Sequence, residues 1–175
     1  NLPISTRTPT NIDQVVTLIN ALPKPLTLDC FVRSLARPLK VFSANSPASV
    51  QPAYDENNPR IFIFINKLIL AVVPKGDSRN LLEMSVKVDA SSSVKGELMF
   101  PISGPISTDV PYSRIIESSF GTSCRTCHTN EGLFAGGGGK VYQSKYIVPD
   151  SATQITQPYM YANALYCNSK ADPFR

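Results

Sequence analysis

Two cysteines and the only histidine of the chain lie within five consecutive residues, Cys124-Arg125-Thr126-Cys127-His128. Two thiols separated by two residues and followed directly by an imidazole are the signature for covalent attachment of haem. The spacing has a physical reason, because one turn of backbone brings both thiols to the vinyl groups on one edge of the porphyrin. The next side chain then points under the ring, where its imidazole binds the iron. We therefore expect one haem, attached through Cys124 and Cys127 and ligated by His128.

Two other interpretations of the motif stay open from the sequence. Cys124 and Cys127 form a disulfide in an exported protein without haem, or they bind zinc together with His128. The fourth zinc ligand would then be Cys30 or Cys167. A redox dithiol of the thioredoxin type is not favoured, because no βαβ pattern surrounds the motif.

The remaining cysteines are Cys30 and Cys167. In an oxidising compartment this even remainder predicts a disulfide between them. In the chain-entropy account, closing so long a loop stabilises the fold by about 4–5 kcal/mol. The bridge would tie the C-terminal region to the N-terminal helices; free thiols or pairing with another chain are the alternatives.

The ligand on the other side of the iron is less well specified. The chain has no second histidine, so ligation by two histidines of one chain is excluded. Met84 and Met99 fall in predicted strands, where core packing is the expected role. Met160 is then the candidate distal ligand, and a thioether there would raise the reduction potential. A lysine amine, the terminal amine, a tyrosinate, water and an open position are the alternatives.

Aromatic side chains are frequent in and after the motif region, and we expect several of them to pack against the faces of the haem. They are Phe120, Phe134, Tyr142, Tyr146, Tyr159, Tyr161 and Tyr166. The glycine run at 136–139 lacks the strand and helix context of a phosphate-binding loop, and it predicts a surface loop.

The elements that must position the motif are read from hydrophobic periodicity. Helical spacing after residues 10–13 predicts a helix that ends before Pro23, and 27–36 is helix or strand. The predicted strands are 39–43, 60–65, 68–73, 81–88 and 94–102, with Asn66-Lys67 as a hairpin turn. A short helix is expected at Tyr112–Phe120. These elements predict an α+β fold, mostly β: a sandwich-like antiparallel sheet with one or two N-terminal helices.

Composition sets the class of protein. The 175 residues are 42% hydrophobic and 17% charged, with a net charge of +4 and 15 prolines. So many prolines argue against a helical bundle, and scattered Lys and Arg argue against a nucleic-acid partner. We expect a β-rich body over 1–104 and a loop-rich C-terminal haem-binding region over 105–175, packed together as one structural unit.

The expected location is outside the cytoplasm: periplasmic, cell-surface or extracellular. No stretch of the sequence is long and apolar enough to predict a transmembrane segment. The sequence begins at Asn1 without Met, as we expect for an exported protein from which a signal segment has been removed.

At Cys124, Cys127 and His128 the chain resembles the single-haem c-type cytochromes. The resemblance covers only the motif, because ordinary small cytochromes of this type place it near the start of a helical domain. It implies haem c as a covalent cofactor and electron transfer as the function, without an enzymatic reaction. The implied partners are redox proteins or neighbouring copies of the chain. The alternative is an extracytoplasmic binding or assembly module without haem, braced by Cys124–Cys127 and Cys30–Cys167 disulfides.

Overall fold

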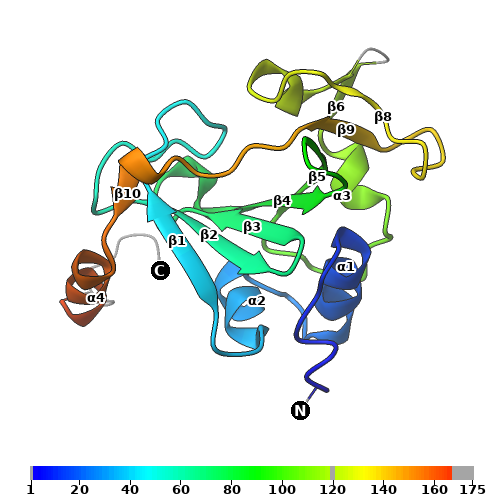
Figure 1. The fold of residues 1–175 in the computed structure, drawn as a ribbon. Coiled ribbons are helices and arrows are strands. Elements are labelled where there is room, and N and C mark those ends of the chain that lie inside the picture. Colours follow the sequence, from blue (N-terminus) through cyan, green and yellow to red (C-terminus); the bar gives the residue numbers. More distant parts are fainter. Residues whose placement is uncertain (1, 119–120, 167–175) are drawn as a thin grey trace.

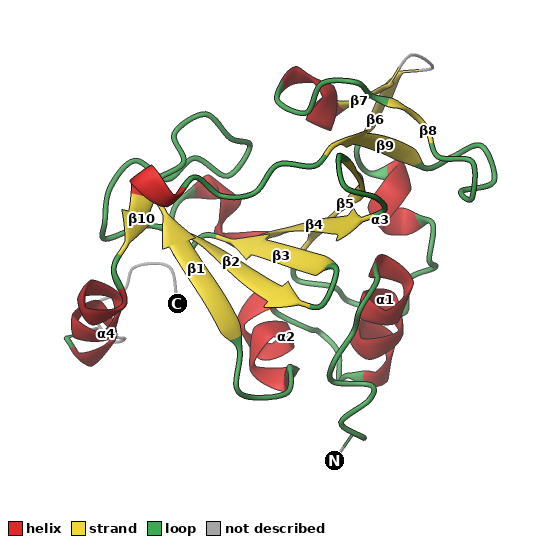
Figure 2. Ribbon diagram, in the orientation of Figure 1, coloured by secondary structure: helices red, strands yellow, loops and turns green. Residues whose placement is uncertain are grey.

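In the computed structural model, residues 2–118 and 121–166 are described. Within them, an antiparallel sheet of eight strands carries two helices on one face, as Figures 1 and 2 show. The helices are α1 (Ile12–Ala21), α2 (Leu28–Ser34), α3 (Val110–Ser113) and α4 (Gln157–Leu165). No helix in this part of the chain has the length and apolar character needed to cross a membrane.

The strand order of the large sheet is β10-β1-β2-β3-β4-β5-β9-β8. Its central strands are β1 (Lys40–Ala44), β2 (Arg60–Ile65), β3 (Leu68–Val72), β4 (Leu81–Lys87) and β5 (Ser92–Met99). The sheet continues beyond β5 with β9 (Tyr142–Lys145), and its edge strands are β8 (Gly132–Leu133) and β10 (Gln154–Ile155). A separate small ribbon pairs β6 (Ile116–Ser118) with β7 (Gly121–Thr122).

The C-terminal region supplies both edges of this sheet. β9 pairs with β5 on one side, and β10 pairs with β1 on the other. The segment 146–153 therefore runs from one edge of the sheet to the other, as Figure 1 shows. We call this segment the strap.

The two N-terminal helices begin at side-chain caps. Asn11 accepts the N–H of Gln14 at the start of α1, and Thr27 accepts the N–H of Cys30 at the start of α2. Such caps satisfy backbone donors that would otherwise have no partner. The ambiguity at 27–36 is thus resolved as helix.

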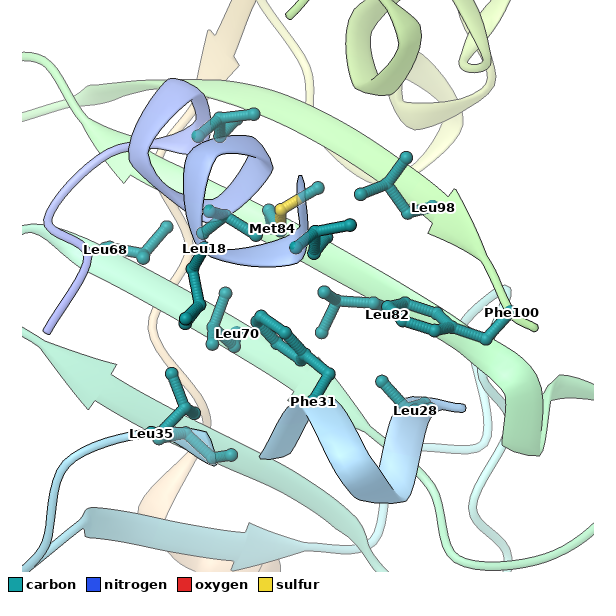
Figure 3. Close-up of a cluster of buried hydrophobic side chains, with 14 of the residues drawn as sticks. Leu18, Leu28, Phe31, Leu35, Leu68, Leu70, Leu82, Met84, Leu98 and Phe100 are labelled. Carbon is teal, nitrogen blue, oxygen red and sulfur yellow. The ribbon is translucent and has the colours of Figure 1, made fainter. Parts of the chain in front are cut away.

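The hydrophobic core lies between these helices and one face of the sheet (Figure 3). Leu18 of α1 and Phe31 of α2 are fully buried there, against Leu70, Leu82 and Met84 of the strands. These strand residues have even numbers, as expected for side chains that alternate between the faces. The odd-numbered neighbours on β3 to β5 point to the opposite face.

The predicted α+β fold with a mainly antiparallel sheet is confirmed. The predicted hairpin is also present, and Asn66 takes a left-handed conformation at its turn (φ 55°).

The helix expected at Tyr112–Phe120 is wrong over most of its length. Pro111, which favours the first turn of a helix, starts α3 earlier, and the helix ends at Ser113. Ile116–Ser118 is the strand β6, where a β-branched residue fits well.

Candidate functional site

The motif forms a single tight turn directly after β7. The N–H of Cys124 donates to the Thr122 hydroxyl (3.2 Å), which caps a 3₁₀ turn over Ser123–Thr126. The N–H of His128 then donates to the Cys124 carbonyl (2.8 Å). The thiols of Cys124 and Cys127 are not joined to each other. This is the compact backbone that haem attachment needs, with both thiols and the imidazole presented within one turn.

The imidazole of His128 is held in one orientation by β9. Its Nδ1 lies 2.9 Å from the carbonyl oxygen of Lys145, to which it donates as the Nδ1–H tautomer. The N–H of Lys145 in turn donates to the Thr129 carbonyl (2.8 Å), so the strand and the motif are locked together. A bond of this kind from one ring nitrogen to a backbone carbonyl fixes the other nitrogen, Nε2, as the metal-binding atom.

The pKa of His128 is lowered, first by burial and then by the positive charge of Lys95; the bond to Lys145 opposes the shift. The neutral form that binds a metal is thereby favoured.

A cavity of about 330 Å³ lies between the motif, the strap and the helix-free face of the sheet. Cys124, Cys127 and His128 all line it. The strap contributes a further wall at Ile147–Asp150, and the loop after β1 contributes residues 45–50. This volume lies within the usual range for small-molecule and cofactor sites. The two thiols and the imidazole therefore line one shared cavity.

The floor of the cavity is the sheet face opposite the hydrophobic core. Phe62, Ala71, Glu83 and Glu97 are cross-strand neighbours on β2 to β5 and form one row of this floor. Ile69, Ser85 and Lys95 form the next row. Phe62, Ile69 and Ala71 thus make the floor apolar on β2 and β3, whereas Glu83, Lys95 and Glu97 make it charged on β4 and β5, and Arg60 of β2 adds a positive charge beside Glu83.

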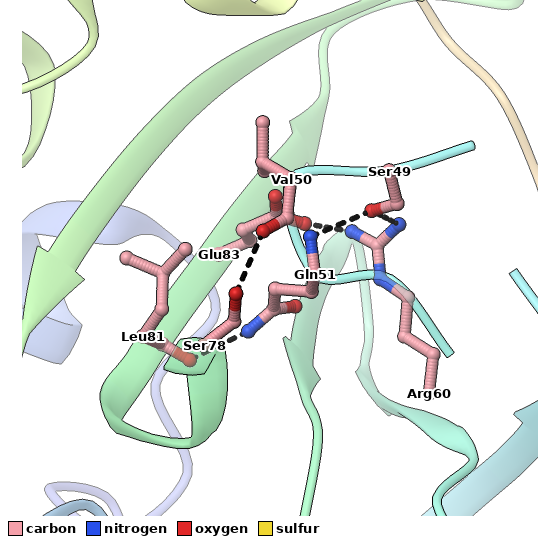
Figure 4. Close-up of polar contacts among 7 residues, drawn as sticks. All are labelled: Ser49, Val50, Gln51, Arg60, Ser78, Leu81 and Glu83. Carbon is pink, nitrogen blue, oxygen red and sulfur yellow. Dashed lines mark hydrogen bonds and ion pairs between the residues drawn. The ribbon is translucent and has the colours of Figure 1, made fainter. Parts of the chain in front are cut away.

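Each acidic residue of the floor has an arginine partner. Arg60 forms an ion pair with Glu83 and also donates to the Ser49 hydroxyl at 2.5 Å, as Figure 4 shows. Arg114 Nε lies 3.3 Å from a carboxylate oxygen of Glu97. Burial raises the pKa of Glu97, and Arg114 opposes this shift. The two carboxylates face each other across β4 and β5, an arrangement that destabilises a sheet unless the charge is compensated.

The loop after β1 is fixed by the Arg60–Ser49 bond and by two further hydrogen bonds. Buried Gln51 donates to the Leu81 carbonyl (2.6 Å), and Ser78 donates to the Val50 carbonyl (2.9 Å), both visible in Figure 4. These bonds hold the polar, Pro-rich loop at 45–59 against the sheet, where it closes one side of the cavity.

Lys95 differs from the other charged residues of the floor. It is buried, and its ammonium donates to the hydroxyl of Ser93. Burial lowers the pKa of Lys95 to about 8, while Cys124 and Glu131 oppose the shift. Its charge therefore lies close to the motif.

The structure does not bring the candidate distal ligand to the motif. Met160 belongs to α4, beyond the β10 edge, and does not line the cavity. Met84 borders the cavity but is 2% exposed and packs in the helix-side core, and Met99 is exposed.

Of the two cysteines outside the motif, the structure describes Cys30. Cys30 is exposed on α2, a helix that packs on the core face of the sheet, and it does not line the cavity. Cys167, and with it the predicted Cys30–Cys167 disulfide, lies outside the described residues. Among residues 2–118 and 121–166, no group of three or more His, Cys, Asp or Glu side chains is placed to hold a metal ion.

The expectation that aromatic residues near and after the motif wall the site is not met by the described residues. The aromatic ring that lines the cavity is that of Phe62, on β2. Phe134 packs against the hydrophobic core, and Tyr146 lies under the Lys87 ammonium (5.0 Å). Phe120 lies outside the described residues. The glycine run forms the turn between β8 and β9, with positive φ at Gly138 and Gly139.

Sequence reasoning missed the charged floor of the cavity. Arg60 begins a mainly apolar predicted strand, and Glu83, Lys95 and Glu97 lie within two others. Their alternation with buried residues is the signal that could have placed them together on one face.

No protein-family model matches the chain, and no curated protein or solved structure matches it either.

Proposed function

We propose that this chain is an exported redox protein that carries one haem c. The haem would be attached through Cys124 and Cys127 and ligated by Nε2 of His128. The observation that carries the proposal is the bond from His128 Nδ1 to the Lys145 carbonyl, on an imidazole that lines one cavity with both motif thiols. A disulfide or a passing surface histidine would need no such orientation.

The cofactor supplies one-electron chemistry, and the protein sets the conditions for it. The turn holds the attachment atoms, and β9 orients the imidazole. The strap and the 45–50 loop limit the access of water, and the charged floor determines the local polarity, which tunes the reduction potential. Ile147 and Val148 are exposed apolar residues of the strap beside the cavity, and a redox partner protein or a neighbouring copy would dock there.

The test is expression in a host that matures c-type cytochromes, followed by an absorption spectrum and intact mass. We expect a Soret band, a pyridine haemochrome spectrum of thioether-linked haem, and a mass increased by one haem. Cys124→Ala with Cys127→Ala should abolish attachment, whereas Cys30→Ala, at an exposed thiol on α2, should leave it unchanged. A colourless wild-type protein with the mass of the bare polypeptide would reject the proposal.

A colourless wild-type protein without haem would support the alternative, a binding or assembly module without a cofactor. Its cysteines would then be disulfides, and the mass would be lower than the polypeptide mass by the hydrogens lost on oxidation. A colourless protein that loses metal to a chelator would instead support zinc.

A second candidate function is the binding of a small ligand at the iron, as in a haem-based sensor or a peroxidase. The observation that favours it is that Met160 does not line the cavity, while Met84 packs in the hydrophobic core on the other face of the sheet. With neither thioether at the site, the iron would keep an open or weakly held position. Carbon monoxide added to the reduced protein should then shift the Soret band within seconds, whereas no shift would favour electron transfer alone.

A further inference from the structure

The carboxylate of Glu131 bonds to the residue that caps the attachment turn. One oxygen accepts the N–H of Thr122 (2.7 Å), and the other accepts the Thr122 hydroxyl proton. Thr122 is 1% exposed, so both bonds are shielded from water on the threonine side. The same hydroxyl accepts the N–H of Cys124. A continuous chain of hydrogen bonds therefore leads from Glu131 through Thr122 to the first attachment cysteine.

A carboxylate suits the two donors of Thr122, because each of its oxygens accepts one of them. The N–H and the O–H each need an acceptor, and a carboxylate has two acceptor oxygens and no proton, whereas an amide has one acceptor and one donor group. The backbone beside the pair is adapted to this contact. A Cβ at Gly121 would lie 2.4 Å from Glu131 Oε1, so glycine is needed for the carboxylate to reach its position.

The charge of Glu131 also acts on the site itself. Its carboxylate accepts the hydroxyl proton of Thr122, and that hydroxyl accepts the N–H of Cys124, so the negative charge lies beside the attachment turn. A negative charge near the iron ligand stabilises the oxidised, more positive iron and so lowers the reduction potential.

We propose that Glu131 is a positioning residue: it holds the Thr122–Cys124 turn in its 3₁₀ conformation, and its charge lowers the reduction potential of the haem attached to that turn. The second half rests on the proposed function, and the first half does not.

The first half is tested on the full-length, haem-free chain by amide hydrogen exchange. In Glu131→Ala, the amides of Thr122 and Cys124 should exchange about tenfold faster or more, because a hydrogen bond to a charged group is lost. Amides of β2 to β4 should keep their protection. Glu131→Gln retains one acceptor and should show a smaller increase. Glu117→Gln, an equal charge change at an exposed residue of neighbouring β6, is the control and should change neither amide.

The second half is tested on the haem-loaded protein. Glu131→Gln should raise the reduction potential above that of the wild type and of Glu117→Gln, and Glu131→Ala should also lower the fraction of chains that carry haem. Thr122 and Cys124 exchange equal to wild type in both Glu131 variants would overturn the positioning role, and an unchanged potential in Glu131→Gln would overturn the electrostatic role. If the wild type never acquires haem, the proposed function fails, while the exchange result still decides the positioning role.

Discussion

At the scale of single residues, the Arg60–Glu83 ion pair is the main polar contact of the cavity floor. Both side chains are largely buried, at 15% and 18% exposure. Burial lowers the pKa of Arg60 to about 10, still high enough to keep the guanidinium charged at neutral pH. We predict that Glu83→Ala lowers the free energy of unfolding by about 2–4 kcal/mol, because it leaves this buried charge without its partner. Urea denaturation at pH 7 measures the change.

The control for that prediction is an exposed ion pair in the same chain. Asp29 and Arg33 lie one turn apart on α2 with a 2.9 Å contact, and each is 67% exposed. Asp29→Asn should cost no more than about 0.5 kcal/mol, since exposed pairs contribute little. Equal losses for the two substitutions would contradict the role assigned to burial.

Lys95 gives the haem-free chain a pH dependence of known sign. Its pKa of about 8 in the folded chain lies below the ordinary value near 10.5. Between these values the unfolded chain binds more protons, so stability rises with pH in this interval. From pH 8 to pH 9.5 we expect the free energy of unfolding of the wild type to gain about 1–2 kcal/mol relative to Lys95→Met. Urea titrations of both proteins at both pH values measure this gain, and a wild type that gains no stability relative to Lys95→Met between pH 8 and pH 9.5 would refute the prediction.

At the scale of elements, the short β7 strand depends on Gly121. Its φ of 150° is unfavourable for other residues, and an added Cβ would collide with Glu131. We predict that Gly121→Ala destabilises the chain by about 1–3 kcal/mol and lowers haem attachment. Thermal unfolding and haem content per chain are the measurements. The matched control is Gly132→Ala on β8, where a Cβ would meet open space and both quantities should stay near wild type.

The elements were predictable to the extent that their signals are local. Capped helices and the apolar β2–β3 hairpin are marked by residues a few positions apart, as the Asn66 turn illustrates. β7, β8 and β10 have only two residues each, too few for any period to be recognised. Their pairing is decided by tertiary contacts rather than by local preference.

The candidate site divides in the same way. Cys124, Cys127 and His128 are recognisable because their spacing is sequential. Lys95 and Glu83 line the same cavity as the motif because the register of the strands places them on that face of the sheet. Strand register depends on pairing between distant segments and is not encoded by a single residue. The acceptor for His128 is a backbone carbonyl, and every residue has one, so no residue type could identify Lys145.

At the scale of the whole molecule, the division into 1–104 and 105–175 can be tested by truncation. α3 packs closely on β5, since a Cβ at Gly96 would lie 3.1 Å from Pro111, and β9 completes the β5 edge. We predict that a fragment of residues 1–104 lacks a cooperative unfolding transition, because it exposes this face and unpairs β5. Circular dichroism with heating, in the presence of a reductant, measures the transition.

The control fragment is 1–156, which keeps β10 and lacks α4. Among its described residues, α4 contains no buried side chain. The control should therefore unfold cooperatively near the temperature of the full chain. A cooperative transition in 1–104 as well would show that the two regions are independent.

The Asn66 turn has a consequence for the opposite end of its hairpin. Because side chains alternate along a strand, a slip of one position at this turn would exchange the two faces of β2. Ile63 would then line the cavity, and Arg60 and Phe62 would point into the hydrophobic core between the sheet and the helices. The backbone conformation of Asn66 thus decides which side chains of β2 line the cavity beside Cys124 and Cys127.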